Sequence, residues 1–144
     1  VNGGCGGACN QAVAGCAGGI LCFLNNDTVV TRGWLSEMVH ILVASQEVGL
    51  VGPSSNGVAN EARVEPGYTG LDGLHKWAGD FVWRHDGESF SIPMLALYCA
   101  ALRREARQEV GGLDVRFATG MFEDDDFSRR IRRAAYHLRC PRGA

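Results

Sequence analysis

The feature that most restricts the fold is a continuous apolar run followed at once by polar, turn-forming residues. Residues 20–24 read Ile-Leu-Cys-Phe-Leu, and Asn25, Asn26 and Asp27 come directly after them. An uninterrupted apolar run bounded by glycine and by a turn is typical of a strand buried on both faces of a parallel sheet. We therefore expect an α/β fold in which the turn at 25–27 lies at the carboxyl end of such a strand.

The rest of the chain alternates helical and extended patterns, which is the rhythm of an α/β layer fold. Residues 8–17 predict a short helix stopped by Gly18-Gly19, and a second helix, capped by Thr31, carries Leu35, Met38, Val39 and Leu42 on one face. The further elements expected are a strand at 48–51, a long loop at 57–73, a hairpin of 81–84 and 89–92 around Asp86-Gly87, a strand at 94–101, a helix at 103–110 and an amphipathic helix at 123–138.

Composition narrows the class of protein. The chain has 144 residues, of which 46% are hydrophobic and 21% charged, as expected for one globular domain spanning residues 1–144. A formal net charge of −2 gives no broad positive surface, so we expect no nucleic-acid partner. The six cysteines have no zinc-finger or CxxC spacing, which indicates reduced thiols in a cytoplasmic protein.

Membrane and targeting signals are not evident in the sequence. No apolar stretch approaches the ~20 residues that span a bilayer, and the opening Val1-Asn2-Gly3-Gly4 does not resemble a signal peptide. The chain also lacks an initiator methionine, which predicts a fragment of a longer protein.

The turn Asn25-Asn26-Asp27 is the first candidate functional site. Open α/β sheets bind ligands at the carboxyl ends of their parallel strands, and a carboxylate there is a hard oxygen ligand that suits Mg²⁺ or Mn²⁺. The two asparagine amides can hydrogen-bond the hydroxyl groups of a sugar or a ribose. Asn and Asp are also favoured turn formers, so the tripeptide alone leaves a purely structural role open.

The second candidate site is the run of four carboxylates at 123–126. A helix N-terminus favours negative charge, and Asp125 and Asp126 can pair with Arg129 and Arg130 one turn later. Alternatively, crowding raises the pKa of one carboxylate, which can then remove a proton from an acceptor hydroxyl as a general base. Sequence pattern alone leaves open both a solvated helix end and a catalytic base.

Several short segments, taken together and in order, resemble one enzyme family. They are Asn2-Gly3-Gly4, Ala8-Cys9-Asn10, Ala17-Gly18-Gly19, Phe23-Leu24-Asn25-Asn26-Asp27-Thr28, Gly33-Trp34-Leu35, Val51-Gly52-Pro53-Ser54-Ser55-Asn56, Gly111-Gly112-Leu113-Asp114-Val115-Arg116-Phe117 and Phe122-Glu123-Asp124-Asp125-Asp126-Phe127. The ordered set is similar to the family 2 inverting glycosyltransferases with the GT-A fold. The resemblance implies a Rossmann-like α/β fold with a mixed, mostly parallel sheet flanked by helices.

The resemblance also implies a role for the first candidate site. Asn25-Asn26-Asp27 falls on the family's DxD-type motif, with Asp27 as the ligand of Mg²⁺ or Mn²⁺. Asn25 and Asn26 would then lie beside the ribose and the sugar of the donor. Asn25 replaces the first Asp of the motif, which leaves Asp27 as its one carboxylate.

For the acidic run, the resemblance implies the catalytic base. Glu123-Asp124 falls on the family's ED motif, with Asp124 as the base and Glu123 beside it in the catalytic pair. Asp125 and Asp126 stay open as alternative bases because they adjoin Asp124 directly.

The implied reaction is a single, inverting displacement between a nucleotide-sugar donor and a carbohydrate or lipid-linked acceptor, as in polysaccharide biosynthesis. The family normally opens with a strand and loop that hold the nucleobase, whereas this chain begins at what corresponds to the third or fourth element. We therefore expect a domain that is incomplete at its N-terminus and that binds nucleotide-sugars poorly by itself. Contact with the inner face of a membrane would arise only through other parts of the protein or through an anionic acceptor.

Two other functions fit the same residues. A non-catalytic carbohydrate-binding or scaffold module could keep this fold without a donor site. A Mg²⁺-dependent nucleotidyltransferase could share the aspartate at the strand end, although the Glu123-Asp124 pair speaks against it.

Overall fold

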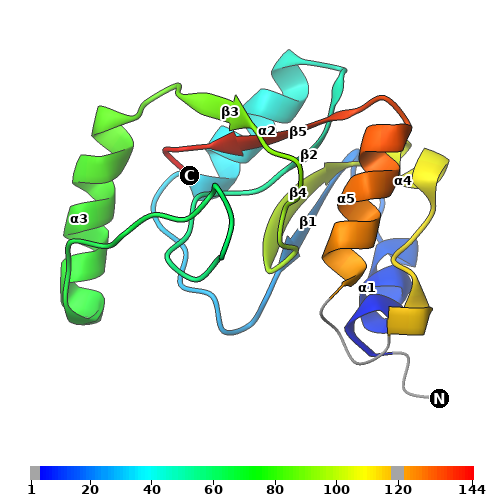
Figure 1. Cartoon of the computed structure of the whole chain (residues 1–144), viewed down its shortest axis with the longest axis horizontal. Coiled ribbons are helices and arrows are strands. Elements are labelled where there is room, and N and C mark those ends of the chain that lie inside the picture. The colour runs from blue at the N-terminus through cyan, green and yellow to red at the C-terminus, as the bar shows by residue number, and fades with distance from the viewer. Residues whose placement is uncertain (1–3, 118–121) are drawn as a thin grey trace.

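The chain folds into a five-stranded mixed sheet with helices on both faces (Figure 1). The computed structural model describes residues 4–117 and 122–144. Its elements are α1 (Gly4–Ala14), β1 (Ile20–Leu24), α2 (Trp34–Ala44), β2 (Val48–Val51), α3 (Gly70–Arg84), β3 (Ser89–Ser91), β4 (Cys99–Arg103), α4 (Arg104–Val110), the 3-10 turn η1 (Val115–Phe117), α5 (Glu123–Arg133) and β5 (His137–Pro141). Two of the family-like residues, Asn2 and Gly3, lie outside the described ranges.

The strand order is β1-β4-β2-β5-β3, and β2 and β5 form the parallel pair while the other three pairings are antiparallel. A mixed α/β sheet was expected and is found. The expectation that the sheet is mostly parallel holds for strand direction, since β1, β2 and β5 run the same way, but not for the pairings. The reason is that β4 inserts in the opposite direction between β1 and β2.

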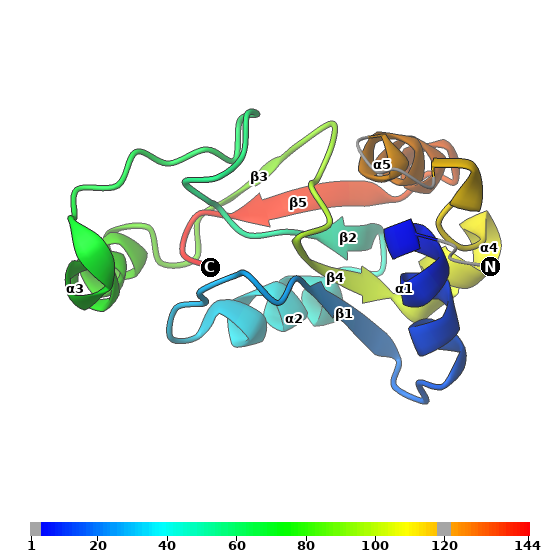
Figure 2. The ribbon, with the colours of Figure 1, turned by 90° about the horizontal axis from the view of Figure 1, so that it is seen from below.

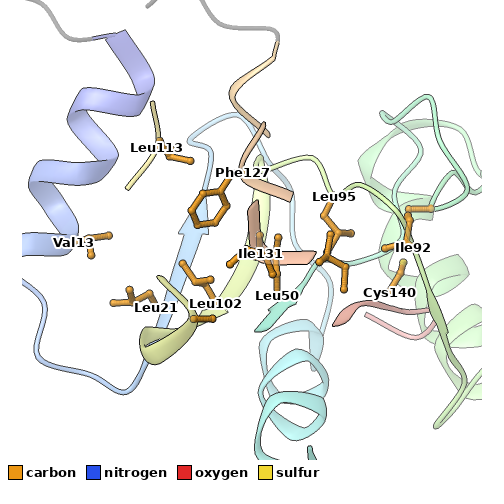
Figure 3. Close-up of a cluster of buried hydrophobic side chains, with 14 residues drawn as sticks. Val13, Leu21, Leu50, Ile92, Leu95, Leu102, Leu113, Phe127, Ile131 and Cys140 are labelled. Atoms are coloured by element: carbon orange, nitrogen blue, oxygen red, sulfur yellow. The ribbon is translucent and has the colours of Figure 1, made fainter. Parts of the chain in front are cut away.

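Two clusters of apolar side chains, one on each face of the sheet, pack the sheet against the helices. Figure 2 shows α2 on one side of the sheet and α5 on the other. Side chains alternate along β4, so that Cys99 and Ala101 pack with Met38 and Leu42 of α2, whereas Ala100 and Leu102 belong to the larger cluster on the opposite face. Figure 3 shows that larger cluster, in which α5 contributes Phe127 and Ile131. The alternation is what a strand covered on both faces requires.

The strand at 20–24 is found where it was expected, but its environment is not the one expected. Only Leu21 is buried in β1, and Leu24 is 46% exposed. The prediction of a strand buried on both faces is therefore wrong for β1, because β1 lies at the end of the strand order and pairs with β4 on one side. The strand that is buried throughout is β2, at Val48–Val51.

The predicted hairpin around Asp86-Gly87 is also wrong. Residues 81–84 form the last turn of α3, in which Leu74 and Ala78 are buried and Trp77 stacks on Phe81 with ring centroids 5.0 Å apart. This i, i+4 spacing is helical, and it outweighs the short extended pattern. The turn itself exists, with Gly87 at φ 72°, but it joins α3 to β3, which pairs with β5.

Other boundaries shift for local reasons. The first helix is α1, Gly4–Ala14, rather than 8–17, and β4 covers Cys99–Arg103 rather than 94–101. Thr31 does not cap α2, whose N-cap is Gly33 at φ 86°. The last helix ends at Arg133 instead of continuing to 138, because Ala135 adopts φ 65° and turns the chain into β5.

Asn10 ties α1 to the loop that precedes the acidic helix. Its side-chain amide nitrogen donates to the carbonyl oxygen of Leu113 at 2.7 Å, and its oxygen accepts from the amide of Leu113 at 2.8 Å. A Cβ at Gly112 would lie 2.3 Å from the Asn10 oxygen, so only glycine allows this close approach. Two of the family-like segments, 103 residues apart, thus meet through one side chain.

We expect Asn10→Ala to lower the free energy of unfolding by about 1–3 kcal/mol, because it leaves both backbone groups of the buried residue Leu113 without partners. Urea denaturation of the wild-type and variant chains measures this loss. Gln11→Ala, an exposed position on the same helix, is the control and should change stability by no more than about 0.5 kcal/mol. Equal stabilities for the two variants would contradict a structural role for Asn10.

Candidate functional site

A cleft of about 490 Å³ opens between the loops that follow β1 and β2 and the helix α3. In Figure 1 these segments lie together in the lower left part of the molecule. Its aromatic wall comprises Trp34, Tyr68, Trp77, Phe81 and Tyr98. Clefts of this size, with apolar walls and a few polar groups, are typical of sites for small ligands.

The polar groups of the cleft come from the ends of the three strands that run in the same direction. Asn25 and Asp27 follow β1, Ser54, Ser55 and Asn56 follow β2, and Arg142 follows β5. Carboxyl ends of strands with a common direction meet at one edge of a sheet, which is where α/β proteins bind ligands. The prediction that the turn at 25–27 lies at such an edge is therefore supported, although β1 itself is an outer strand.

The turn after β1 is fixed through its backbone. The amide of Asn25 donates to the carbonyl oxygen of Tyr98 at 2.7 Å, and the amide of Thr28 donates to the carbonyl oxygen of Asn25 at 3.3 Å. Asn25 and Asp27 line the cleft, whereas Asn26 is not among its described lining residues. Two of the three residues predicted to contact a donor thus face the same space.

Asp27 is the one Asp or Glu side chain among the described residues that line the cleft. Within residues 4–117 and 122–144, no group of three or more His, Cys, Asp or Glu side chains is placed to hold a metal ion. One carboxylate suffices for Mg²⁺ when a bound phosphate group and water supply the other oxygen ligands. The donor set therefore fits an ion that arrives with a phosphorylated ligand, and it does not fit a closed structural metal site.

The acidic run opens α5, where the first free N–H groups of the helix favour negative charge. Glu123 accepts a hydrogen bond from the amide of Phe122 at 3.1 Å. Asp126 accepts from Nε of Arg130 at 2.8 Å, so the expected i,i+4 pair forms. The expected pair between Asp125 and Arg129 is not found among the described residues.

Asp124 differs from its neighbours in its surroundings. Its side chain is partly buried, and this burial is the main reason why the pKa of its carboxyl is raised above the ordinary value. The amide of Asp125 donates to Oδ1 of Asp124 at 3.0 Å and opposes the shift, while the negative charges of Glu123 and Asp125 add to it. We expected crowding by neighbouring carboxylates to raise this pKa, but desolvation by burial is the larger cause of the shift.

Figures 1 and 2 both place the turn after β1 and the first residues of α5 at the same edge of the sheet, on either side of the segment 92–98. Glu123 and Asp124 are not among the described residues that line the cleft. The segment 92–98 forms hydrogen bonds both with α5 and with the turn after β1. The amide of Leu95 donates to Oγ of the buried Ser128 in α5 at 3.1 Å, and Tyr98 accepts the hydrogen bond from Asn25.

Sequence reasoning missed Tyr98 and Arg142 as residues of the cleft. Burial raises the pKa of Tyr98 to about 12, with hydrogen bonding to Ser55 acting in the opposite direction, so its phenol is a neutral donor at physiological pH. Ser54, Ser55 and Asn56 could have been found, because they follow an apolar strand as Asn25 and Asp27 do. The long loop predicted at 57–73 ends where α3 begins at Gly70, and its residues Gly57, Val64, Pro66 and Tyr68 line the cleft.

In the part of the chain that the structure describes, no helix has both the length and the apolar character needed to cross a bilayer.

Comparison with known proteins identifies one matching family model, Glycosyl transferase family 2, over residues 1–111. The match includes Asn25, Asn26 and Asp27 and ends before α5. The O-antigen biosynthesis protein RfbC of Myxococcus xanthus is 34% identical in an alignment 123 residues long, which covers 75% of this chain and 9% of that protein. The uncharacterized protein y4gI of Sinorhizobium fredii (strain NBRC 101917 / NGR234) is 33% identical in an alignment 138 residues long, which covers 89% of this chain and 15% of that protein. The chain thus spans a small part of the length of these relatives.

Proposed function

The chain belongs to glycosyl transferase family 2, and from this membership we propose that the protein transfers a sugar from a nucleotide-sugar donor to an acceptor hydroxyl, with inversion at the anomeric carbon. The acceptor class is a carbohydrate or a lipid-linked carbohydrate, which is consistent with a relative named for O-antigen biosynthesis. Membership of this family argues against the alternative of a nucleotidyltransferase.

The observation that carries the proposal is the difference between the carboxylates of α5. Asp126 is engaged by Arg130, whereas Glu123 and Asp124 each accept a hydrogen bond from a backbone amide. Asp124 is partly buried, with a pKa raised above that of an ordinary carboxyl. A carboxylate with a raised pKa holds a proton more readily, which is the property that a general base needs. We therefore propose Asp124 as the base, with Glu123 beside it.

In the proposed reaction, the carboxylate of Asp124 takes the proton of the acceptor hydroxyl. The oxygen forms a bond to the anomeric carbon while the bond from that carbon to the diphosphate oxygen breaks, and the electron pair leaves with the nucleoside diphosphate. One displacement gives inversion. Asn25 and Asn26 are proposed to hydrogen-bond donor hydroxyls, and Asp27 to hold Mg²⁺ or Mn²⁺, which when bound stabilises the negative charge on the leaving diphosphate.

We expect Asp27→Asn in the full-length protein to lower kcat/KM by at least about 100-fold, since charge stabilisation by a bound metal is worth several kcal/mol and each 1.4 kcal/mol is about tenfold in rate. Transfer assays over a series of Mn²⁺ concentrations measure the loss. Asp72→Asn is the matched control, because Asp72 is an exposed carboxylate of α3 that does not line the cleft. Unchanged Mn²⁺ dependence in Asp27→Asn would show that Asp27 is not the metal ligand.

A further inference from the structure

A second polar corner of the cleft lies where β2 and β5 end. These two strands are the parallel pair of the described sheet, and the amide of Gly52 donates to the carbonyl oxygen of Arg139 at 3.2 Å, just beyond β2. The chain segments that follow the two strands therefore leave the sheet side by side. They bring Ser54 against Pro141, the residue before Arg142, and Ser54, Ser55 and Arg142 all line the cleft.

Arg142 is the one Lys or Arg side chain among the described residues that line the cleft. Its amide donates to the carbonyl oxygen of Glu88 at 2.9 Å, and its guanidinium lies over the ring of Phe90, 5.1 Å from the centroid. These contacts hold the backbone and the side chain in place. The apolar ring supports the guanidinium without satisfying its N–H groups.

The positive charge of Arg142 is only weakly compensated. Its Nε lies 3.7 Å from Oε2 of Glu88, which is longer than a hydrogen bond. The same oxygen of Glu88 has a closer partner in Nδ1 of His85, at 2.9 Å. The Arg142 side chain is 47% exposed, so its donors are available to a ligand in the cleft.

The two serines add hydroxyl groups to this corner. Oγ of Ser54 lies 3.4 Å from the carbonyl oxygen of Pro141, a long contact that a ligand oxygen can replace. Oγ of Ser55 accepts from the amide of Gly57 at 3.0 Å and also hydrogen-bonds the phenol of Tyr98, so a ligand oxygen would share this hydroxyl with Tyr98. A guanidinium and two hydroxyls that line the same cleft are a donor set suited to the oxygens of a phosphate group.

We propose that Ser54, Ser55 and Arg142 form a phosphate-binding subsite of the cleft. This inference rests on the proposed function, since the phosphate belongs either to the diphosphate of the donor or to a phosphorylated, lipid-linked acceptor. The two sources share the same chemistry, and binding measurements separate them.

The test is calorimetry on the full-length protein in EDTA and again with Mn²⁺. Donor-side probes are UDP, GDP and dTDP, and the acceptor-side probe is farnesyl phosphate. We expect Arg142→Ala to weaken binding of at least one class by about 10- to 100-fold, the range for a lost hydrogen bond to a charged group. Arg142→Lys, which keeps the charge but not the paired donors, should recover part of the affinity.

Arg84→Ala is the control, because Arg84 is exposed at the end of α3 and does not line the cleft; its affinities should equal those of the wild type. Weaker nucleotide binding in Arg142→Ala assigns the subsite to the donor, and weaker binding of farnesyl phosphate assigns it to the acceptor. Wild-type affinity for all probes in a folded Arg142→Ala protein overturns the proposal. That result is independent of the base and metal assignments, which the Asp124 and Asp27 variants test by transfer rates.

Discussion

Replacement of Asp124 by Asn in the full-length protein is expected to lower kcat by about 10²- to 10⁴-fold, the usual contribution of a general base. The amide has nearly the same shape as the carboxyl but cannot take the acceptor's proton. Donor affinity should stay within about threefold of the wild type, because the general base acts on the acceptor hydroxyl rather than on the donor. Single-turnover kinetics and donor titration measure the two quantities separately.

The same substitution is expected to leave stability unchanged or to raise it. Because the pKa of Asp124 is raised in the folded state, the folded chain binds the proton more tightly than the unfolded chain. Stability therefore falls as pH rises from the unfolded pKa through the folded one, and the ionised carboxylate carries a cost at neutral pH. Asn carries no charge and no such cost. Loss of activity with retained stability is the pattern of a functional residue rather than a structural one.

Two further variants serve as controls for this assignment. Asp126→Asn removes the acceptor of Arg130 and should lower stability by less than about 1 kcal/mol without loss of catalysis. Asp125→Asn tests the neighbouring carboxylate, for which the sequence left a role as base open. Wild-type rates in Asp124→Asn together with loss of activity in Asp125→Asn would assign the role of the base to Asp125 instead of Asp124. Wild-type activity in all three variants would show that none of these aspartates is the base, and would leave Glu123 as the remaining carboxylate of the run.

We expect Phe127→Ala to lower the free energy of unfolding by about 3–5 kcal/mol, the range for removing a large aromatic side chain from a packed core. Phe127 is 1% exposed and packs in the larger cluster beside Ile131 and Leu102 (Figure 3). Denaturation in urea measures the loss as a shift of the midpoint at constant slope.

Phe122→Ala is the matched control for Phe127→Ala. It removes the same side chain just before α5, where Phe122 is 60% exposed, and should change stability by about 0.5 kcal/mol or less. Phe127→Leu should fall between the wild type and Phe127→Ala because it leaves a smaller cavity. A loss below about 1 kcal/mol for Phe127→Ala would contradict the packing described for this cluster.

The sequence predicted elements whose pattern is local and missed features that depend on distant neighbours. The helix predicted to begin at residue 123 does begin there, and its amphipathic pattern agrees with the burial of Phe127 and Ile131. The end of α5 did not, because the turn depends on Ala135 at a positive φ, which non-glycine residues rarely adopt. The apolar pattern of residues 20–24 was read correctly as a strand. Its place at the end of the sheet is decided by β4, which pairs with it from almost eighty residues away.

The candidate site, like the fold, could be predicted from the sequence only in part. Asp27 was placed at a strand end by the apolar run before it, and the structure puts it in the cleft. Arg142 was missed because the helix pattern at 123–138 was extended over the start of β5, so no strand end was recognised near Arg142. Ser128 was missed because a serine in a charged helix gives no signal of burial, although it is the described polar side chain most completely removed from solvent.

The hydrogen bonds of residues 92–98 have a thermodynamic consequence. Leu95 hydrogen-bonds Ser128 of α5, and Tyr98 hydrogen-bonds Asn25. One short stretch of backbone therefore contacts both the helix of the acidic run and the turn that carries Asp27. A ligand that displaced the turn, and residues 92–98 with it, would also displace α5, and the coupling free energy would then be the same in both directions. Donor occupancy and acceptor deprotonation would then be linked equilibria, so that each partner's affinity reports on the other.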